Sequence, residues 1–477
     1  MKRTEDTGSK QPDMSSHCLL HDAKDAFAAR LWLIRSARRS LDVQYYIWHN
    51  DMSGSLLLDE IAAAAQRGVA VRLLIDDNGI DGLDGRLAIL DALPMVAVRL
   101  YNPFRMRRFR ALEWLLAFHR LNSRMHAKSL TADEHMTIVG GRNIGDEYFG
   151  AQSKAQFEDL DVLTAGPVVA EVKQVFDQHW HSAAVRPVAD VVGRLSRKAK
   201  CDTMRKAEAI AQGPAAQRYL EAIEAQPLYT DLRLDRAKWF RAPTRAIAAM
   251  PLPETTTSPD RATGLNELLP QTLPHPANDL VLISGYFVPT EQGCDELGDL
   301  RRSGVSVRVL TNSYASTDVG VVHAGYAPFR KVLLQHGIEL FEIPAPDDAP
   351  KKRAAKFLRS GSERSRRFSG KSLHAKVYVV DRRYFYIGSA NFDPRSAHLN
   401  TELGFIIESA ALSEQLANAF ERAAHNSYRM SLLPDGALAW TDTRDDQPVP
   451  ERIEPGTNPI SRAMVRLLAK LPIDRHL

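Results

Sequence analysis

Two stretches of this 477-residue chain repeat one pattern of residues at a constant separation. RMHAKSLTADEHMTIVGGRN ends at Asn143, and SLHAKVYVVDRRYFYIGSAN ends at Asn391. Each contains His-x-Lys-x4-Asp, followed by a glycine and an asparagine at fixed distances. A single copy can arise by chance from common residue types, whereas two copies that agree at every spacing indicate a duplicated unit. The matched pairs, all 248 positions apart, are His126 and His374, Lys128 and Lys376, Asp133 and Asp381, Gly140 and Gly388, and Asn143 and Asn391.

The duplication extends beyond these motifs. Apolar runs that indicate buried strands alternate with helical patterns before the first motif, and the same order returns before the second. Such alternation predicts βαβ units. We therefore expect an α/β fold of two similar halves, each with a mixed, mostly parallel sheet and flanking helices. The corresponding strands are expected at 41–48 and 279–289, at 69–77 and 304–313, and at 95–103 and 337–346.

The repeat also sets the expected domain boundaries. The polar N-terminal segment is predicted to be a disordered tail, and a charged, helical stretch separates the two halves. The C-terminal tail contains a basic amphipathic helix that is expected to begin after Pro459. The five parts are the N-terminal tail at 1–18, the first half at 19–190, the connector at 191–239, the second half at 240–430 and the C-terminal tail at 431–477.

Composition places the chain among globular proteins, with 44% hydrophobic and 25% charged residues. The net charge of +4 favours anionic partners without selecting among nucleic acid, lipid headgroups and phosphate. Three widely separated cysteines lack zinc-binding spacing and predict free thiols. The N-terminal segment has no apolar region typical of a secretory signal. No run of about 18 apolar residues occurs, so no transmembrane helix is expected.

The two motifs resemble the HKD motifs of the phospholipase D superfamily. The phrases LDVQYYIWHNDMSG, VGGRNIGDEYFG and GSANFDPRS are more narrowly similar to bacterial cardiolipin synthases, especially those of the C type. The resemblance covers the chain from about residue 20 to the C-terminus. It implies two phospholipase D-like halves related by a pseudo-two-fold axis, with the motifs facing each other at one interfacial active site.

The residue types in the motifs suit a phosphodiester. Side chains alternate along a strand, so the histidine and lysine of each motif are expected to point into one pocket. The two lysines, Asn143 and Asn391 then form an anion site for the non-bridging oxygens of a phosphate. Ser389, at the position where the first motif has Gly141, is a further candidate donor to the phosphate. Because the lysines supply positive charge and no carboxylate cluster suits magnesium or calcium, we expect neither a metal nor another cofactor.

The two histidines are expected to divide the work. One attacks phosphorus and forms a phosphohistidine, and the other protonates the departing alcohol. The sequence is symmetric on this point, whereas the resemblance favours His126 as nucleophile and His374 as acid. A carboxylate that accepts from the other ring nitrogen fixes the tautomer of a histidine. Asp159 and Glu402, at equivalent positions of the two halves, are the candidates for this role.

The motif aspartates have two interpretations. Asp133 and Asp381 follow the motif strands in tight turns, where aspartate is common because of its turn chemistry. The alternative interpretation assigns them to the catalytic set with the histidines and lysines. Four further residues near strand ends either line a site for the acceptor or cap turns and helices; these are His49, Asp51, Asp76 and Asp77.

The motif determines the chemistry at phosphorus but not the groups attached to it. The segment 104–121 mixes arginines with large apolar residues, and the segment 351–371 carries nine basic residues and one acidic residue. The first suits a membrane interface, and its alternative is a packed helix. The second suits anionic headgroups or a nucleic-acid backbone, and its alternative is a solvated, disordered loop. The alternation of aromatic and basic residues typical of single-stranded nucleic-acid binding is weak.

The resemblance implies a phosphatidyltransferase that makes cardiolipin, with phosphatidylglycerol as acceptor. Phosphatidylglycerol itself or a second phospholipid is the donor, and a small alcohol such as glycerol leaves. The alternatives are a phospholipase D-type hydrolase that releases phosphatidic acid and, less in keeping with the length of the chain, a nuclease. A non-catalytic binding module conflicts with four intact motif histidines and lysines. We expect a cytoplasmic protein attached peripherally to the inner membrane, with no nucleic-acid partner.

Overall fold

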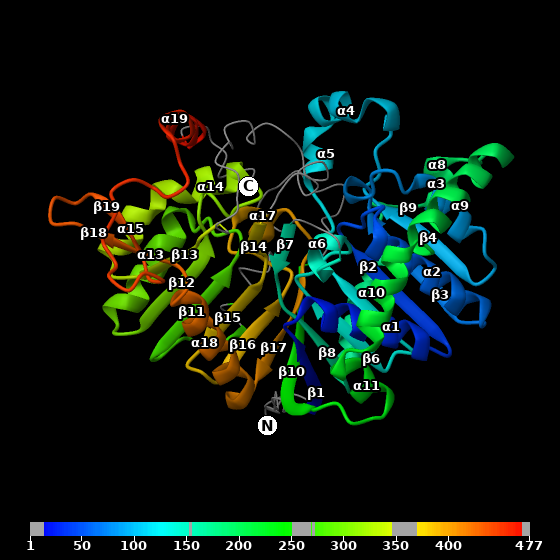
Figure 1. The fold of residues 1–477 in the computed structure, drawn as a ribbon, viewed down its shortest axis with the longest axis horizontal. Coiled ribbons are helices and arrows are strands. Elements are labelled where there is room, and N and C mark those ends of the chain that lie inside the picture. The colour runs from blue at the N-terminus through cyan, green and yellow to red at the C-terminus, as the bar shows by residue number, and fades with distance from the viewer. Residues whose placement is uncertain (1–13, 152–154, 250–268, 270–271, 346–369, 470–477) are drawn as a thin grey trace, which may run out of the picture.

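The computed structural model describes residues 14–151, 155–249, 269, 272–345 and 370–469. Two α/β halves lie next to each other along the long axis of the molecule (Figure 1). In chain order the first half contains β1 (Met14–Leu20), α1 (Ala23–Ser36), β2 (Ser40–Tyr45), α2 (Met52–Gln66), β3 (Ala70–Asp76), η1 (Asp77–Gly79), α3 (Asp84–Asp91), β4 (Val96–Tyr101), η2 (Arg107–Phe109), α4 (Arg110–Leu116), α5 (Phe118–Asn122), β5 (Ser129–Ala132), β6 (Met136–Gly140), α6 (Asp146–Phe149), β7 (Ala155–Glu158), β8 (Asp161–Ala165), α7 (Val168–Trp180), β9 (Val185–Pro187) and α8 (Val188–Val192).

The second half repeats this plan, so the prediction of two similar α/β halves is confirmed. Three helices connect the halves: α9 (Arg197–Ala211), α10 (Pro214–Glu224) and α11 (Pro227–Arg233). The second half and C-terminal segment contain β10 (Phe240–Ala248), β11 (Asp279–Ser284), α13 (Thr290–Arg302), β12 (Ser306–Asn312), α14 (Gly320–Tyr326), η4 (Ala327–Phe329), α15 (Arg330–Gln335), β13 (Glu339–Ile343), β14 (Gly370–Leu373), β15 (Lys376–Val380), β16 (Tyr384–Gly388), α17 (Pro394–His398), β17 (Leu403–Glu408), α18 (Ala410–Ala424), β18 (Tyr428–Leu432), β19 (Leu438–Asp442) and α19 (Pro459–Leu468).

One 17-stranded sheet runs through both halves. The first half contributes the order β9-β4-β3-β2-β5-β6-β8-β1. The second half continues it as β10-β17-β16-β15-β11-β12-β13-β18-β19. The halves join where β1 pairs with β10 in antiparallel register, with Met14 opposite Pro243. The repeat therefore produces two equivalent strand orders that meet at a seam.

The sheet is mixed, as predicted, but the expectation that it is mostly parallel is wrong. Only β2-β3-β4 and β11-β12-β13 are parallel among the described strands of this sheet. The motif strands instead return through tight hairpins. Asp133 and Glu134 have φ of 54° and 60°, and Asp381 and Arg382 have φ of 51° and 50°. Two successive residues with positive φ reverse the chain directly into an antiparallel neighbour.

The predicted disordered tail at 1–18 is wrong for its last residues. Met14–Leu20 forms β1, which pairs with β8 of the first half and with β10 of the second. Its polar side chains are satisfied there, since His17 hydrogen-bonds Thr164 at 3.0 Å and Thr244 at 2.7 Å. Residues 1–13 lie outside the described part of the chain, as does the basic segment 351–369.

A shared core holds the halves together as one body. Val139, Val162 and Phe176 of the first half belong to the same buried apolar cluster as Val281 and Phe385 of the second. Burial of apolar side chains is the dominant favourable term in packing, so the seam is a continuous hydrophobic interface. No helix in the described ranges is long and apolar enough to cross a membrane.

Candidate active site

Two short backbone pairings across the seam position the first of two histidine–carboxylate pairs. β7 of the first half pairs in parallel with β14 of the second, with Glu158 opposite Leu373. The amide of His374 then donates to the carbonyl of Glu158 at 2.8 Å. Asp159 and His374 are the next residues of the two segments, and Oδ2 of Asp159 lies 2.6 Å from Nδ1 of His374.

The second pairing has the same form with the halves exchanged. Met125 and Thr401 form an isolated parallel bridge, and the amide of His126 donates to the carbonyl of Thr401 at 2.9 Å. His126 and Glu402 follow, and Nδ1 of His126 lies 3.0 and 2.9 Å from the two carboxylate oxygens of Glu402. Each motif histidine therefore contacts a carboxylate supplied by the opposite half.

The two carboxylates are held in different ways. The hydroxyls of Ser389 and Ser396 donate to the two oxygens of Glu402, and the Ser389 oxygen also accepts from the amide of Leu403. The equivalent of Ser389 in the first half is Gly141. A Cβ added there meets Oδ1 of Asp159 at 2.2 Å, so only glycine leaves room for this carboxylate.

Ser389 was predicted to bind phosphate, and the structure gives its side chain another position. Its hydroxyl is engaged by Glu402 and by the backbone of β17, as described above. The prediction is therefore corrected: Ser389 contacts the histidine-facing carboxylate rather than lying free to meet a phosphate. Ser396 of α17, which also donates to Glu402, was not singled out by the sequence because a single serine carries no distinctive spacing.

The motif lysines lie beside the histidines and are fully buried. Nζ of Lys128 donates to the carbonyl of His126, and Nζ of Lys376 donates to that of His374 and lies 3.0 Å from its Nδ1. Burial lowers the pKa of Lys128 to about 7, against the opposing charge of Glu402. Burial also lowers the pKa of Lys376. Two ammonium groups in a buried site can bind the charge of a phosphate when their carboxylate partners also hold the histidines.

Strand alternation does not explain this grouping, although the sequence prediction relied on it. β5 begins at Ser129, so His126 and Lys128 both precede it, and β15 begins at Lys376, after His374. The side chains meet because the lysine folds back onto the histidine carbonyl and because the histidine is fixed by pairing across the seam. The juxtaposition was predicted, but its structural cause was not.

Both imidazoles are neutral in the unliganded site. Burial, followed by the charges of Lys128 and Lys376, holds the pKa of His126 well below its usual value. Burial and Lys376 lower the pKa of His374 to about 4, while Asp159 acts in the opposite direction. An adjacent carboxylate thus favours the protonated form of His374.

The two carboxylates also differ in charge. Burial raises the pKa of Glu402 to about 7, opposed by Lys128. Burial acts on Asp159 in the same sense, but His374 and Lys376 outweigh it and hold the pKa of Asp159 below its usual range. Asp159 thus remains ionised beside His374, whereas Glu402 titrates near neutrality. The site is symmetric in its geometry and asymmetric in its electrostatics.

The motif asparagines are both buried, but their hydrogen-bond partners differ. Oδ1 of Asn143 accepts from the amide of Ile47 at 3.1 Å, and its Nδ2 donates to the hydroxyl of Tyr148 at 3.0 Å. Asn391 is 3% exposed, and its backbone amide donates to the hydroxyl of Ser396 at 3.0 Å. The Asn143 side chain is thus committed to the pocket wall in this conformation.

Aromatic rings enclose the histidines. The Tyr46 ring lies 5.2 Å from that of His126 and the Tyr286 ring 6.1 Å from that of His374. These tyrosines follow corresponding strands of the two halves, β2 and β11. Tyr148 of α6 and Phe157 of β7, whose rings lie 5.3 and 5.2 Å from His374, were missed because a single aromatic residue in so short an element carries no distinctive spacing.

Asp133 and Asp381 do not join this cluster, which corrects their assignment to the catalytic set. Asp133 lies at the far end of β5, where its carboxylate accepts from the amides of residues 38–40. Asp381 accepts in the same way from the amides of residues 277–279. Four strand residues lie between each aspartate and its motif lysine. The five steps along the chain correspond to about 17 Å at 3.3 Å per residue.

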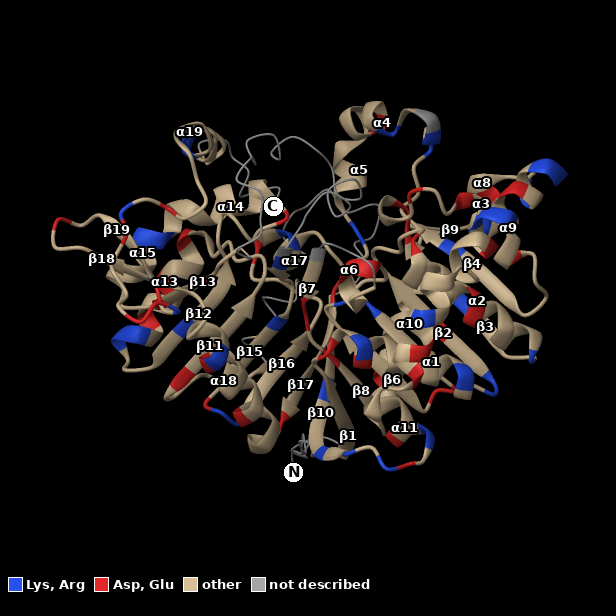
Figure 2. Ribbon diagram, viewed as in Figure 1, with Lys and Arg blue, Asp and Glu red and all other residues tan. Residues whose placement is uncertain are grey.

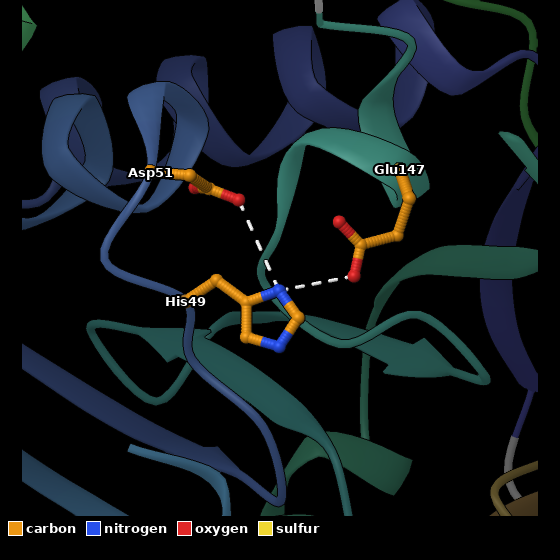
Figure 3. A group of neighbouring side chains, drawn as sticks. All are labelled: His49, Asp51 and Glu147. Atoms are coloured by element: carbon orange, nitrogen blue, oxygen red, sulfur yellow. Dashed lines mark ion pairs between the residues drawn. The ribbon is translucent and has the colours of Figure 1, made fainter. Parts of the chain in front are cut away.

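His49, Asp51 and Glu147 are the one group of three potential metal ligands found in the described ranges, with donor atoms within 4.8 Å (Figure 3). Nδ1 of His49 lies 3.0 Å from Glu147 and 3.9 Å from Asp51. However, both oxygens of Asp51 already accept from backbone amides, of Gly54 at 2.9 Å and of Asp146 at 2.8 Å. Asp51 is the N-cap of α2, and the group ties this helix to α6.

Asp76 and Asp77 also have structural partners rather than an open site. Asp76 accepts from Arg124 at 3.1 Å and from the amide of Met125, next to His126. Asp77 accepts from Arg107 and from the amide of Phe104 at 2.8 Å. Both carboxylates therefore brace the segment that leads into the first motif. The prediction that they cap turns is confirmed for Asp76, which accepts from the amide of Asn78 as the N-cap of η1.

Both halves of the chain are similar in sequence to one family of known proteins. The family described as "Cardiolipin synthase, PLD-like domain" matches residues 31–180 and 271–424, one stretch in each half. Cardiolipin synthase C of Escherichia coli is 40% identical over 471 residues, covering 98% of this chain and 97% of that protein. Cardiolipin synthase A of Pseudomonas syringae is 26% identical over 401 residues, covering 83% of this chain and 66% of that protein.

The fold has also been seen in a solved structure. A phosphatidylserine synthase from Haemophilus influenzae aligns with a TM-score of 0.59 over 97% of this chain and 95% of that one. Its sequence identity is 15%, so this likeness concerns the fold alone.

Proposed function

Because the chain belongs to the cardiolipin synthase family of phospholipase D-like proteins, we propose that it is a phosphatidyltransferase of the cardiolipin synthase type. It moves a phosphatidyl group between phospholipids through a phosphohistidine. The observation that carries this proposal is the crosswise pairing of each motif histidine with a carboxylate of the other half. A reaction in two displacement steps needs one histidine as nucleophile and the other as proton carrier, and ionised Asp159 beside His374 favours His374 as the proton carrier.

In the first step, His126 is the nucleophile. Its Nδ1–H donates to Glu402, which leaves the lone pair of Nε2 to attack phosphorus. Its strongly lowered pKa keeps the imidazole neutral. A P–N bond forms, the P–O bond to the departing headgroup breaks, and His374 gives its proton to the alcohol oxygen. Ionised Asp159 stabilises the imidazolium that His374 must form, and the bound phosphate adds negative charge beside it.

In the second step, His374 acts as the base. It takes the proton from the hydroxyl of phosphatidylglycerol, whose oxygen attacks phosphorus as the P–N bond to His126 breaks. Cardiolipin leaves and both histidines return to their starting state. With water as the acceptor the same sequence of bonds gives phosphatidic acid, so exclusion of water decides between transfer and hydrolysis.

Lys128 and Lys376 hold the charge that develops on phosphorus. Their buried ammonium groups lie beside the two histidines and face a site of low dielectric, where their interaction with non-bridging oxygens is strong. We assign Asn143 and Asn391 to the wall of the same site. The two lysines supply the positive charge that other phosphoryl-transfer enzymes obtain from a metal ion.

The substrate places the reaction at a lipid surface. Phosphatidylglycerol keeps its acyl chains in a bilayer, so we propose that the enzyme attaches peripherally to the cytoplasmic face of the inner membrane and draws the headgroup into the seam. Phosphatidylglycerol is the proposed acceptor, and the donor is phosphatidylglycerol or a second phospholipid.

The test is an assay of the purified chain with labelled phosphatidylglycerol in detergent micelles, alone and with a second phospholipid. Products are separated by mass spectrometry, and His126→Ala and His374→Ala are measured in parallel. We expect cardiolipin from the wild type alone. Phosphatidic acid as the sole product would identify a hydrolase. Absence of any lipid product would exclude the proposal, and single-stranded DNA and RNA would be the next substrates.

A further inference from the structure

The segment before the first motif exposes large apolar side chains in a concentrated patch. Ten residues across η2, α4 and α5 contain five of them, which we call the α4–α5 face. Their exposed fractions are 65% for Phe109, 47% for Leu112, 79% for Leu115, 70% for Leu116 and 42% for Phe118. Phe109, Leu112 and Leu116 recur at helical spacing, so an apolar stripe of this segment points away from the protein.

The inner side of the same segment is firmly attached, so the outward stripe is a fixed feature. The Trp114 ring packs 6.3 Å from that of Phe104 and 6.0 Å from that of Phe118, and the Arg124 guanidinium lies 5.4 Å from Trp114. Buried Glu113 accepts from the amide of Arg105 at 3.0 Å and pairs with Arg120 at 2.5 Å. A helix whose polar and aromatic side faces the protein while leucines face outward has the reverse of the usual surface pattern.

The α4–α5 face lies beside the active site. α5 ends at Asn122, four residues before His126, and Asn122 accepts from Arg395 of α17 at 2.6 Å. The hydroxyl of Ser123 donates to the carbonyl of Leu399 at 3.1 Å. The base of the segment is thus bonded to the opposite half at the seam, a few residues before the motif histidine in the chain.

A second exposed apolar helix projects at the same edge of the molecule. α4 and α19 stand at opposite ends of the upper edge in Figure 1, on either side of the seam. α19 packs through Val465 against Tyr314 and Ala324, while Ile460 and Leu467 are 67% and 63% exposed. This edge therefore carries two apolar projections, one from each half.

The residues that border these projections are basic. Arg105 before α4 and Arg466 in α19 are exposed, and α19 contains no acidic residue. Figure 2 shows basic residues in blue on α19 and beside α4. The acidic groups Asp81 and Asp84 pair with Arg110 and Arg107. Apolar side chains with a basic border are complementary to an anionic phospholipid surface, where leucine and phenylalanine enter the interface and arginine meets the headgroups.

We propose that the α4–α5 face, supported by α19, docks onto a phospholipid bilayer and holds the seam over the headgroups. This inference rests on the proposed function in one respect, namely that the substrate is a bilayer lipid. It adds which surface meets the bilayer. A second copy of the chain is the competing occupant of this face.

The test is flotation of the full chain with phosphatidylglycerol vesicles and with phosphatidylcholine vesicles. The variant Leu115→Ser/Leu116→Ser removes the two most exposed leucines of the face. Leu234→Ser is the matched control, because Leu234 is 52% exposed at the end of α11, at the opposite edge of the molecule in Figure 1. Turnover is measured on vesicles and on a short-chain phospholipid below its micelle concentration, and the oligomeric state is measured by light scattering.

We expect the wild type and Leu234→Ser to float with phosphatidylglycerol vesicles, and the double variant to bind them about tenfold or more weakly. The ratio of turnover on vesicles to turnover on the short-chain lipid should fall by a similar factor in the double variant. His126→Ala should float like the wild type while making no product, which separates docking from chemistry. Equal flotation of the double variant and the wild type would overturn the proposal. So would a dimer that the double substitution converts to a monomer without any effect on vesicle binding.

Discussion

Glu402, in the second half of the chain, holds Nδ1 of His126, in the first half, at 2.9 Å. The contact crosses the seam, and the same is true of Asp159 and His374. Neither half therefore contains a complete histidine–carboxylate pair in its own sequence. The two halves function as one active site because each sets the tautomer of the histidine in the other.

The crosswise contact predicts the effect of removing one carboxylate. In Glu402→Gln a neutral side-chain amide replaces the carboxylate that accepts from the Nδ1–H of His126. Part of the His126 population then carries its proton on Nε2, which removes the lone pair that attacks phosphorus. We expect kcat to fall by about 10²- to 10⁴-fold with a smaller change in KM. Glu408→Gln is the control, because Glu408 lies six residues away on β17 and pairs with Arg383 at the surface. A kcat within a factor of two of the wild type would contradict the role assigned to Glu402.

The carboxylate of Asp159 can be displaced without replacing Asp159 itself. In Gly141→Ala the new methyl group would lie 2.2 Å from Oδ1 of Asp159, so the carboxylate must move away from His374. We expect loss of kcat with an unchanged far-UV spectrum and an altered pH profile. Gly293→Ala in α13 is the control, because its nearest neighbour would be at 3.5 Å and it has no positive φ. Full activity of Gly141→Ala would show that Asp159 is free to relax.

The sequence predicted which residues form this site, but not how the two halves bring them together. The repeated spacing identified both histidines and both lysines, and the equivalence of the halves identified Asp159 and Glu402. It could not show that each histidine pairs with the opposite half, because equivalent residues of a repeat are interchangeable in sequence. The parallel bridge between Met125 and Thr401 joins residues 276 positions apart and leaves no local pattern.

Two errors have definite physical reasons. Asp133 and Asp381 belong to the motif in sequence, yet the strand between each aspartate and its lysine places the aspartate at the far end of that strand. The sheet was expected to be mostly parallel because buried strands are apolar in either direction, so a run such as 376–380 does not reveal its orientation. The turn residues at 381 and 382 were the available signal, since two positive φ angles in succession make a hairpin.

The corrected role of Asp381 gives a stability prediction. Burial alone raises the pKa of this carboxyl, but the amides of residues 277–279 outweigh it and lower the pKa. A depressed folded-state pKa stabilises the fold above the unfolded-state value, and this contribution is lost as pH falls through the folded-state pKa. We expect Asp381→Asn to lower the free energy of unfolding by about 1–3 kcal/mol at neutral pH, and less in acid. Urea titrations at neutral and at acidic pH measure the free energy of unfolding. The kcat of Asp381→Asn should be largely retained. A catalytic aspartate would show the reverse pattern, with kcat lost and stability kept.

The pH dependence of kcat/KM should be a narrow bell with its maximum near neutrality. Burial raises the pKa of Glu402 to about 7, so below that pH it becomes protonated and no longer presents a negative charge to His126. Burial lowers the pKa of Lys128 to about 7, so above that pH the positive charge that binds phosphate is lost. Lys128→Arg should remove the alkaline limb at a reduced overall rate, because arginine stays charged. The measurement is kcat/KM from about pH 5 to pH 9 on a monomeric lipid. An alkaline limb that persists in Lys128→Arg would assign it to another group.

The identity of the nucleophile can be read from a trapped intermediate. His374→Ala lacks the acid and base but keeps the pair of His126 and Glu402. A phosphatidyl ester of nitrophenol needs no proton on its leaving group, so His126 should still displace it and form the P–N bond. Without His374 no base activates the acceptor, and the phosphohistidine should accumulate. Mass spectrometry of the proteolysed protein should find an acid-labile, base-stable adduct on His126. His126→Ala, with Asp159 and His374 intact, should give none, because His374 is the histidine that its ionised carboxylate favours as the proton carrier. An adduct on His374 in that variant would reverse the assignment of the two histidines while leaving their crosswise pairing unchanged.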